Sequence, residues 1–252
     1  MKKAILKTNK LTKTFATGKV QQQVITNLDL EIYEGDFTVI MGASGSGKST
    51  LLYALSGMDT PSSGSVDFMG TDISKLNSDK MALFRRRYCG FVFQQMYLLD
   101  NMSIMDNVLA CGLLVSKDKK SIIAHARKLF SDVDLKEDTY QKFPTQVSVG
   151  QAQRAAIVRA LINKPLVVFA DEPTGALNSA SGAAVLDMLT EVNRTGQSIV
   201  MVTHDIKSAL RGNSILYLMD GVIRGTCELG HYEEGNELRR KQLDAFLAEM
   251  GW

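Results

Sequence analysis

A glycine-rich stretch, GASGSGKS at residues 42–49, constrains the fold more than any other part of the sequence. It matches the pattern GxxxxGK[ST], which forms a phosphate-binding loop where it connects a strand to a helix. The apolar run FTVIM precedes it and helix-compatible residues follow, so both neighbours meet that condition. Glycines let backbone N–H groups wrap phosphate oxygens at a helix N-terminus, where the helix dipole favours an anion. The sequence therefore predicts a phosphate site in this segment, the phosphate loop.

Lys48 and Ser49 complete the chemistry of the phosphate loop. A lysine here supplies a cation to the β- and γ-phosphates of a nucleotide, and the hydroxyl that follows is a ligand for magnesium. The alternative is a glycine-rich turn that only opens a helix. Many classes of nucleotide-binding protein share this loop, so a second motif has to separate them.

Adjacent carboxylates end the apolar run LVVFA at 166–170. Asp171 is placed to hold magnesium through water, and Glu172 to orient or deprotonate an attacking water. The alternative is an acidic turn that merely follows a buried strand. A GTPase would carry NKxD, but the stretch NKPL at 163–166 has Leu in place of that Asp. A small-molecule kinase remains open at this point.

Composition excludes several classes of protein. A formal charge of +2, from 29 basic and 27 acidic residues, gives no reason to expect binding to nucleic acid. The cysteines Cys89, Cys111 and Cys227 lack CxxC spacing, which indicates reduced thiols rather than disulfides or zinc. No apolar run reaches the roughly 18 residues of a membrane span. We therefore expect a cytosolic chain in which any spanning segment belongs to another subunit.

The order of apolar patterns predicts an α/β fold. A strand is expected at 28–33 from the alternation in LDLEIY, and three more in the apolar runs at 37–41, 166–170 and 198–203. A helical stretch at 181–193 separates the last two runs, as in buried parallel strands joined by a crossover helix. Helical spacing dominates from Ser78 to about Lys164, interrupted by the apolar FVF at 91–93, which indicates a largely helical insertion.

The C-terminal part of the chain shows two further patterns. Two short strands flank Asp220-Gly221, a strong signal for a β-hairpin. An amphipathic tail follows, and its apolar residues on one side are Leu238, Leu243, Phe246, Leu247 and Met250.

Over nearly its whole length the chain resembles the nucleotide-binding subunit of an ATP-binding cassette (ABC) transporter. The motifs that carry the resemblance occur in the family's order: LTKTF ending at Phe15, the phosphate loop, GFVFQQ, VSVGQAQR, ADEP, GALN and VTHD. The resemblance implies that Phe15 stacks on adenine and that Gln94 reports γ-phosphate and magnesium to a membrane partner. It places a switch histidine at His204.

The resemblance also implies a full set of site residues. Those expected to contact ATP are Phe15, Gly42, Ser44, Gly45, Gly47, Lys48, Ser49, Thr50, Ser148, Gly150 and Gln151. Catalytic roles fall on Glu172, His204 and Gln94. Ser49, Gln94 and Asp171 are the expected contacts of Mg²⁺.

The family's architecture is a RecA-like P-loop core with an antiparallel β layer and an inserted helical subdomain. Applied here, it implies one nucleotide-binding domain over 1–230, with its core at about 1–88 and 164–230, its helical subdomain at about 89–163, and an amphipathic helix over 231–252. Two cassettes are expected to close head to tail, each ATP lying between one phosphate loop and the other chain's VSVGQ segment. The expected partners are a second cassette, in a homodimer, and a transmembrane permease that holds the chain at the cytoplasmic face of the membrane.

Within the family, FRRRYCGFVFQQMYLLDNMSIMDNV and FADEPTGALN look most like the macrolide-export and lipoprotein-release group, and within it the bacitracin-resistance type. This implies a subunit that powers export or extraction of an antimicrobial peptide, antibiotic or lipid-like compound. Two alternatives stay open: an ATP-driven transmembrane regulator resembling the cell-division branch, and a partly degenerate nucleotide-binding partner of a second cassette.

The segment VSVGQ at 147–151, here called the signature, departs from the family pattern. Val147 and Val149 replace Leu and Gly, and Asn178 stands where Asp is usual. Ser148 to Gln151 fits the S-x-x-Q capping box, so a helix is expected to begin there. We expect Val149 to restrict the backbone and crowd an approaching phosphate, which predicts slow hydrolysis with retained ATP binding.

Overall fold

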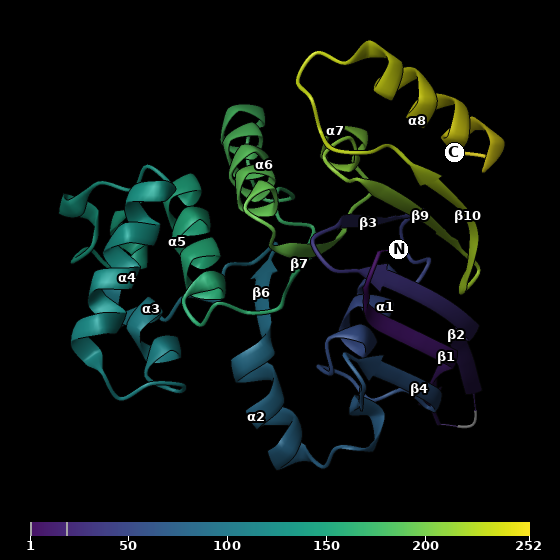
Figure 1. The fold of residues 1–252 in the computed structure, drawn as a ribbon, viewed down its shortest axis with the longest axis horizontal. Coiled ribbons are helices and arrows are strands. Elements are labelled where there is room, and N and C mark those ends of the chain that lie inside the picture. The colour runs from purple at the N-terminus through teal and green to yellow at the C-terminus, as the bar shows by residue number, and fades with distance from the viewer. Residues whose placement is uncertain (1, 19) are drawn as a thin grey trace. The chain divides into compact units, whose positions relative to one another are not determined.

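The protein is described by a computed structural model that covers residues 2–18 and 20–252, without the side chain of Thr17 (Figure 1). The chain divides into two compact units. Unit 1 comprises the segment up to Met81 and the segment from Val192 onward, and unit 2 is Ala82–Glu191. The boundaries of the functional subdomains, expected near 88/89 and 163/164, stay a prediction.

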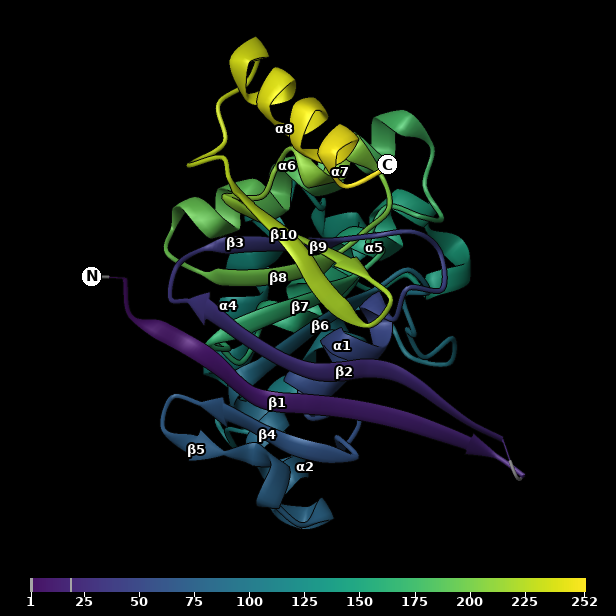
Figure 2. The ribbon, with the colours of Figure 1, turned by 90° about the vertical axis from the view of Figure 1, so that its right-hand side faces the viewer.

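An antiparallel sheet forms the N-terminal part of unit 1, in the order β2-β1-β4-β5. Its strands are β1 (Ala4–Thr17), β2 (Val20–Tyr33), β4 (Ser63–Phe68) and β5 (Thr71–Asp72). Strands β1, β2 and β4 lie side by side (Figure 2). The expected strand at 28–33 is confirmed but is longer. The run of glutamines at 21–23 shows no apolar alternation, yet it pairs with the end of β1.

Buried parallel strands form the second sheet segment of unit 1. They are β3 (Phe37–Met41), β8 (Ser198–Val202) and β9 (Ser214–Met219), with β10 (Val222–Glu228) antiparallel at the edge. Strand β3 lies between β8 and β9. Every residue of β3 and β8 is buried, which explains their continuous apolar sequences. The hairpin is confirmed: Asp220 and Gly221 have φ of 51° and 75°, the left-handed pair that a type I′ turn needs.

Unit 2 combines two parallel strands with helices. The strands are β6 (Cys89–Phe93) and β7 (Val167–Asp171). The helices are α2 (Ser78–Tyr88), α3 (Ile104–Gly112), α4 (Lys119–Asp132), α5 (Val149–Leu161) and α6 (Ser179–Arg194), of which α2 and α6 each extend slightly beyond the unit. Short 3₁₀ turns lie at η2 (Glu137–Thr139) and η3 (Pro144–Gln146). The helical patterns expected between Ser78 and Lys164, and at 181–193, are confirmed.

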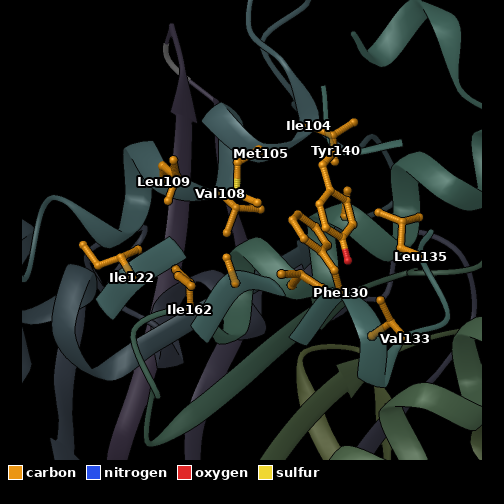
Figure 3. Close-up of a cluster of buried hydrophobic side chains, with 13 residues drawn as sticks. Ile104, Met105, Val108, Leu109, Ile122, Phe130, Val133, Leu135, Tyr140 and Ile162 are labelled. Carbon is orange, nitrogen blue, oxygen red and sulfur yellow. The ribbon is translucent and has the colours of Figure 1, made fainter. Parts of the chain in front are cut away.

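Helices α3, α4 and α5 enclose an apolar cluster (Figure 3). Val108 and Ala155 are fully buried in it. The rings of Phe130 and Tyr140 stack with their centroids 4.6 Å apart. Burial of such side chains is worth about 1.5–3 kcal/mol each, so this cluster gives the helices of unit 2 a core of their own.

The cysteines fit the expectation of reduced thiols. Cys89, Cys111 and Cys227 are all free. Burial raises the pKa of the Cys89 thiol to about 12. Within residues 2–18 and 20–252, no helix combines the length and the apolar character that crossing a membrane requires.

The remaining helices belong to unit 1: α1 (Lys48–Leu55), the 3₁₀ turn η1 (Ile73–Lys75), α7 (Ile206–Ala209) and α8 (Glu237–Glu249). Helix α8 buries Leu243 and Leu247, as the amphipathic tail predicts, but Leu238 is 77% exposed. The next residue, Arg239, is buried instead. Its guanidinium donates to the main-chain carbonyls of Leu210, Gly212, Leu229, Gly230 and His231. One arginine therefore joins α8 to two loops of unit 1.

Replacing Arg239 with Met should lower the free energy of unfolding by about 2–4 kcal/mol, because several carbonyls lose a charged donor in a buried site. Urea denaturation of the full chain measures this. Arg240→Met is the matched control: Arg240 is exposed and lies 3.7 Å from Asp244, so its loss should change stability by less than about 0.5 kcal/mol. Equal effects of the two substitutions would contradict the role of Arg239.

Candidate functional site

The phosphate loop leaves the carboxyl end of β3 and enters α1. Gly45 and Gly47 have φ of 80° and 97°, left-handed values that side chains disfavour. Gly47 is the N-cap of α1 and has no side chain with which to cap it. A helix start without a side-chain cap can accommodate an anion such as phosphate, which the helix dipole favours there.

Lys48 and Ser46 provide polar atoms inside the loop. The ammonium of Lys48, which is 7% exposed, donates to the carbonyls of Gly42 and Ala43 at 2.9 and 2.8 Å. The loop thus folds around its lysine. The hydroxyl of Ser46 is buried and has no hydrogen-bond partner among the described atoms. Ser46 was missed from the sequence because the motif leaves its position free.

Close backbone approach explains the first glycine of the loop. A Cβ at Gly42 would collide with the carbonyl of Leu218 in β9, and would lie 2.7 Å from the Ser46 hydroxyl. Of the other predicted contacts, Ser44 is exposed, whereas Ser49 and Thr50 are half-buried in the first turn of α1. The loop is therefore locked against the neighbouring strand while its outer face stays open.

His204 lies at the same edge of unit 1 as the phosphate loop. Strands β3 and β8 are parallel and pair Ile40 with Val202, so the residues that follow each strand leave the sheet together. The Thr203 hydroxyl accepts from the N–H of Asp205 at 3.0 Å, and Asp205 caps α7. These contacts fix the backbone on both sides of His204, whose side chain is exposed.

Phe15 is a partly exposed ring on β1. Its side chain is 43% exposed, and the ammonium of Lys13 lies 5.0 Å from the ring centroid. Lys13 is itself held by Asp59, at 2.6 Å, and by the carbonyl of Thr60, at 2.8 Å. An exposed ring with a cation beside it suits stacking on a nucleotide base. No sequence pattern indicates this role of Lys13, because its partners lie more than 40 residues away.

In unit 2, Gln94, Asp171 and Glu172 lie at the carboxyl ends of two paired strands. Strands β6 and β7 are parallel and pair Phe93 with Asp171, so Gln94 and Glu172 both follow directly from one pair. A Cβ at Gly175 would lie 2.8 Å from the amide nitrogen of Gln94. The Gln94 side chain therefore lies along the turn at 171–175, here called the acidic turn.

The backbone of Glu172 is left-handed, with φ of 47°. For a residue with a long side chain this conformation costs of order 1 kcal/mol or more, and such strain concentrates at functional sites. The N–H of Gly175 donates to the carbonyl of Glu172 at 3.0 Å and closes the turn. The acidic turn thus holds one carboxylate in the strand and directs the next out of it.

The signature forms the N-terminus of α5, and the capping box is confirmed. The Ser148 hydroxyl accepts from the N–H of Gln151 at 3.2 Å, and the Gln151 side chain accepts from the N–H of Ser148 at 2.9 Å. A Cβ at Gly150 would lie 3.1 Å from the Ser181 hydroxyl, so Gly150 lets α5 approach α6 closely. The cap occupies the side-chain oxygen of Gln151 and the N–H of Gln151.

Two residues that depart from the family pattern, Val149 and Asn178, lie at helix N-termini. Val149 is the first residue of α5 and 53% exposed. The expected restriction of the backbone by Val149 and the crowding of a phosphate stay predictions. Asn178 accepts from the N–H of Ser181 at 2.9 Å and so begins α6, a role that Asp fills equally well. At position 149, the difference from the family pattern is therefore an exposed valine side chain in place of glycine.

Comparison with proteins of known sequence identifies the family. The ABC transporter family model matches residues 25–175. The uncharacterized ABC transporter ATP-binding protein MJ1508 of Methanocaldococcus jannaschii is 42% identical over 84% of this chain and 94% of its own length. The bacitracin export ATP-binding protein BceA of Halalkalibacterium halodurans is 37% identical, with 87% of each chain covered. The macrolide export protein MacB of Shewanella sp. is 40% identical over 88% of this chain, which spans only 34% of that relative.

The fold leads to the same family. The ATP-binding cassette MJ0796, solved as a dimer in a post-hydrolysis state with ADP and Pi, has a TM-score of 0.83 and 35% identity to this chain. The match covers 90% of this chain and all of that one. The RecA-like core with an antiparallel β layer and an inserted helical subdomain is confirmed. The chain belongs to the ABC transporter family, in which it is an ATP-binding and ATP-hydrolysing cassette.

Proposed function

We propose that the phosphate loop binds the phosphates of ATP and that Glu172 is the base that activates water for hydrolysis. The uncapped start of α1, with its left-handed glycines, is the observation that carries the proposal. Its N–H groups and the Lys48 ammonium would bind the β- and γ-phosphates, and the buried Ser46 hydroxyl would gain the acceptor it lacks. Phe15 would stack on the adenine.

The residues that the family resemblance assigns to catalysis have the chemistry for hydrolysis. Glu172 would accept the proton of the attacking water, and His204 would contact the γ-phosphate. The hydroxyl of Ser49, the amide oxygen of Gln94 and the carboxylate of Asp171 are hard oxygen donors, which fit Mg²⁺. When bound, Mg²⁺ would neutralise charge on the phosphates.

We further propose that a second copy of this chain completes each site. The dimeric form of the cassette MJ0796 supports this arrangement. The capped N-terminus of α5, with Ser148 and Gly150, would then meet the γ-phosphate held by the other chain, because a helix N-terminus favours an anion. The isolated chain should accordingly be weakly active, and a permease that holds two copies together should raise its activity.

The names of the relatives support a role in export. Those relatives export macrolides and bacitracin, so we propose a peptide, an antibiotic or a lipid-like compound as cargo and a transmembrane permease as partner. Through that permease the chain would lie at the cytoplasmic face of the membrane. A regulator of a periplasmic enzyme is the alternative, and transport of cargo by the assembled complex separates the two.

Replacing Lys48 with Ala should weaken ATP binding by at least about tenfold, because it removes the cation that faces the phosphates. Equilibrium titration of the purified chain with ATP measures this. Lys80→Ala, which removes an exposed lysine from unit 1, should bind ATP like the unmodified chain. An unchanged affinity in Lys48→Ala would contradict the assignment of the phosphate loop.

Replacing Glu172 with Gln should leave ATP affinity intact and slow hydrolysis by about a hundredfold or more, because a general base contributes that much. The ATP-bound dimer should then accumulate, which light scattering detects. Glu137→Gln, an exposed change in unit 2, is the control. If Glu172→Gln turns over ATP at the normal rate, another group is the base.

Combining Val149→Gly with Asn178→Asp should raise the hydrolysis rate of the complex with its permease. A tenfold gain corresponds to about 1.4 kcal/mol of barrier, and removal of the exposed valine would supply it by letting phosphate approach α5. The cost in stability should stay below about 1 kcal/mol, since Asp keeps the α6 cap and Gly weakens only a helix end. A rate no higher than that of the unmodified complex would mean that the valine is accommodated in the dimer.

A further inference from the structure

Gln153 is a buried residue of α5, two residues after the signature, and it has no part in the proposed hydrolysis. Its side chain is fully buried, with 0% exposure. The amide nitrogen donates to two main-chain carbonyls, that of Phe93 at 3.1 Å and that of Pro173 at 2.8 Å. Both carbonyls belong to unit 2 but lie far from Gln153, and from each other, in the sequence.

These two carbonyls adjoin the residues proposed to act on ATP. Phe93 is the last residue of β6, and Gln94 follows it. Pro173 directly follows Glu172 in the acidic turn. One amide group therefore connects the helix of the signature to the backbone beside Gln94 and to the backbone beside Glu172.

Within the described part of the chain, the amide of Gln153 is hydrogen-bonded on its donor side alone. Since both neighbours are carbonyl oxygens, only the NH₂ side of the amide can face them. The oxygen is then directed elsewhere, and Gln153 Oε1 has no hydrogen-bond partner among the described atoms. A buried acceptor without a partner costs about 1–3 kcal/mol, which offsets part of what the two donated hydrogen bonds contribute.

Arg159 also hydrogen-bonds α5 to the segment 93–97, here called the Gln94 loop. Its guanidinium donates to the carbonyls of Met96 and Tyr97, both at 2.6 Å. The rings of Phe93 and Tyr97 meet edge to face, with centroids 5.3 Å apart. Helix α5 therefore holds the Gln94 loop on both sides of Gln94.

We propose that Gln153 is a positioning residue that holds the backbone of the Gln94 loop and of the acidic turn against the signature helix. The side chains of Gln94 and Glu172 would then be placed for hydrolysis through this amide. The inference rests on the proposed function, because it assigns those two residues to hydrolysis. Gln153 itself acts only through the backbone and touches no reacting atom.

Gln153→Met tests the proposal, because it keeps the length of the side chain and removes both donated hydrogen bonds. Hydrolysis by the full chain, measured in a single turnover with chain in excess of ATP, should slow by about tenfold or more, since misplaced catalytic groups cost at least that much. Equilibrium affinity for ATP should stay unchanged, because the phosphate loop belongs to unit 1. A hydrolysis rate within about twofold of the unmodified chain would overturn the proposal.

Asn163→Leu is the matched control. The Asn163 amide likewise donates to two main-chain carbonyls of unit 2, those of Arg86 and Cys111, at 3.1 and 3.0 Å. Neither carbonyl adjoins Gln94 or Glu172, so this variant should keep its hydrolysis rate. An equal loss of rate in both variants would mean that Gln153 is only structural.

A double-mutant cycle separates this inference from the proposed role of Glu172. If Gln153 acts by placing Glu172, Gln153→Met should slow a Glu172→Gln chain much less than it slows the unmodified chain. Losses that multiply fully would overturn the link to Glu172. Glu172→Gln with a normal rate would instead refute the proposed base, while the comparison of Gln153→Met with Asn163→Leu would still decide whether the amide positions the Gln94 loop.

Gln153→Glu provides a pH profile in case the Met variant folds poorly. The two facing carbonyls and burial disfavour the ionised carboxylate, so the pKa of the introduced carboxyl should be raised. Only the protonated form has an O–H to donate, so activity relative to the unmodified chain should rise as the pH falls through that pKa. A ratio that does not change with pH would contradict the need for a donor at this position.

Discussion

The left-handed glycine loop that leads into α1 is the constraint on which the phosphate site depends. Gly47 has no side chain to cap the helix, and the left-handed glycines keep side chains out of the loop. The ammonium of Lys48 donates to the carbonyls of Gly42 and Ala43, which holds its positive charge within the loop. A phosphate group satisfies the N–H groups of the loop and the cation together. Parallel pairing of β3 with β8 then places His204 at the same sheet edge.

Local sequence patterns predicted the elements but not their long-range contacts. The run FTVIM has the bounds of β3, and Asp220-Gly221 is the turn of the hairpin, because continuous apolar residues and left-handed turn residues are local signals. The capping box at Ser148 is local as well. By contrast, the N-terminal half of β2 is polar and exists because β1 pairs with it.

The candidate site shows the same division. Motifs predicted Lys48 and Glu172 because their residue types and spacing carry the chemistry, and the family resemblance predicted Gln94. The sequence could not predict Ser46, because its hydroxyl stands out only through burial. It could not predict Gln153 either, because the partners of its amide lie 20 and 60 residues away. The signature illustrates a further limit. Its valine looked like damage in the sequence, yet it begins a regular helix and projects into solvent in a single chain.

Amide hydrogen exchange of the full chain, with and without ATP, tests the central claim most directly, because the account assigns the phosphates to specific N–H groups. ATP should slow exchange at Gly45, Gly47 and Lys48 even in dilute, monomeric chain. It should slow exchange at Val149 and Gly150 only at concentrations where two chains associate. Protection of the phosphate loop that appears only together with protection at the start of α5 would limit the claim to the dimer. Unchanged exchange at all three loop residues in saturating ATP would contradict it.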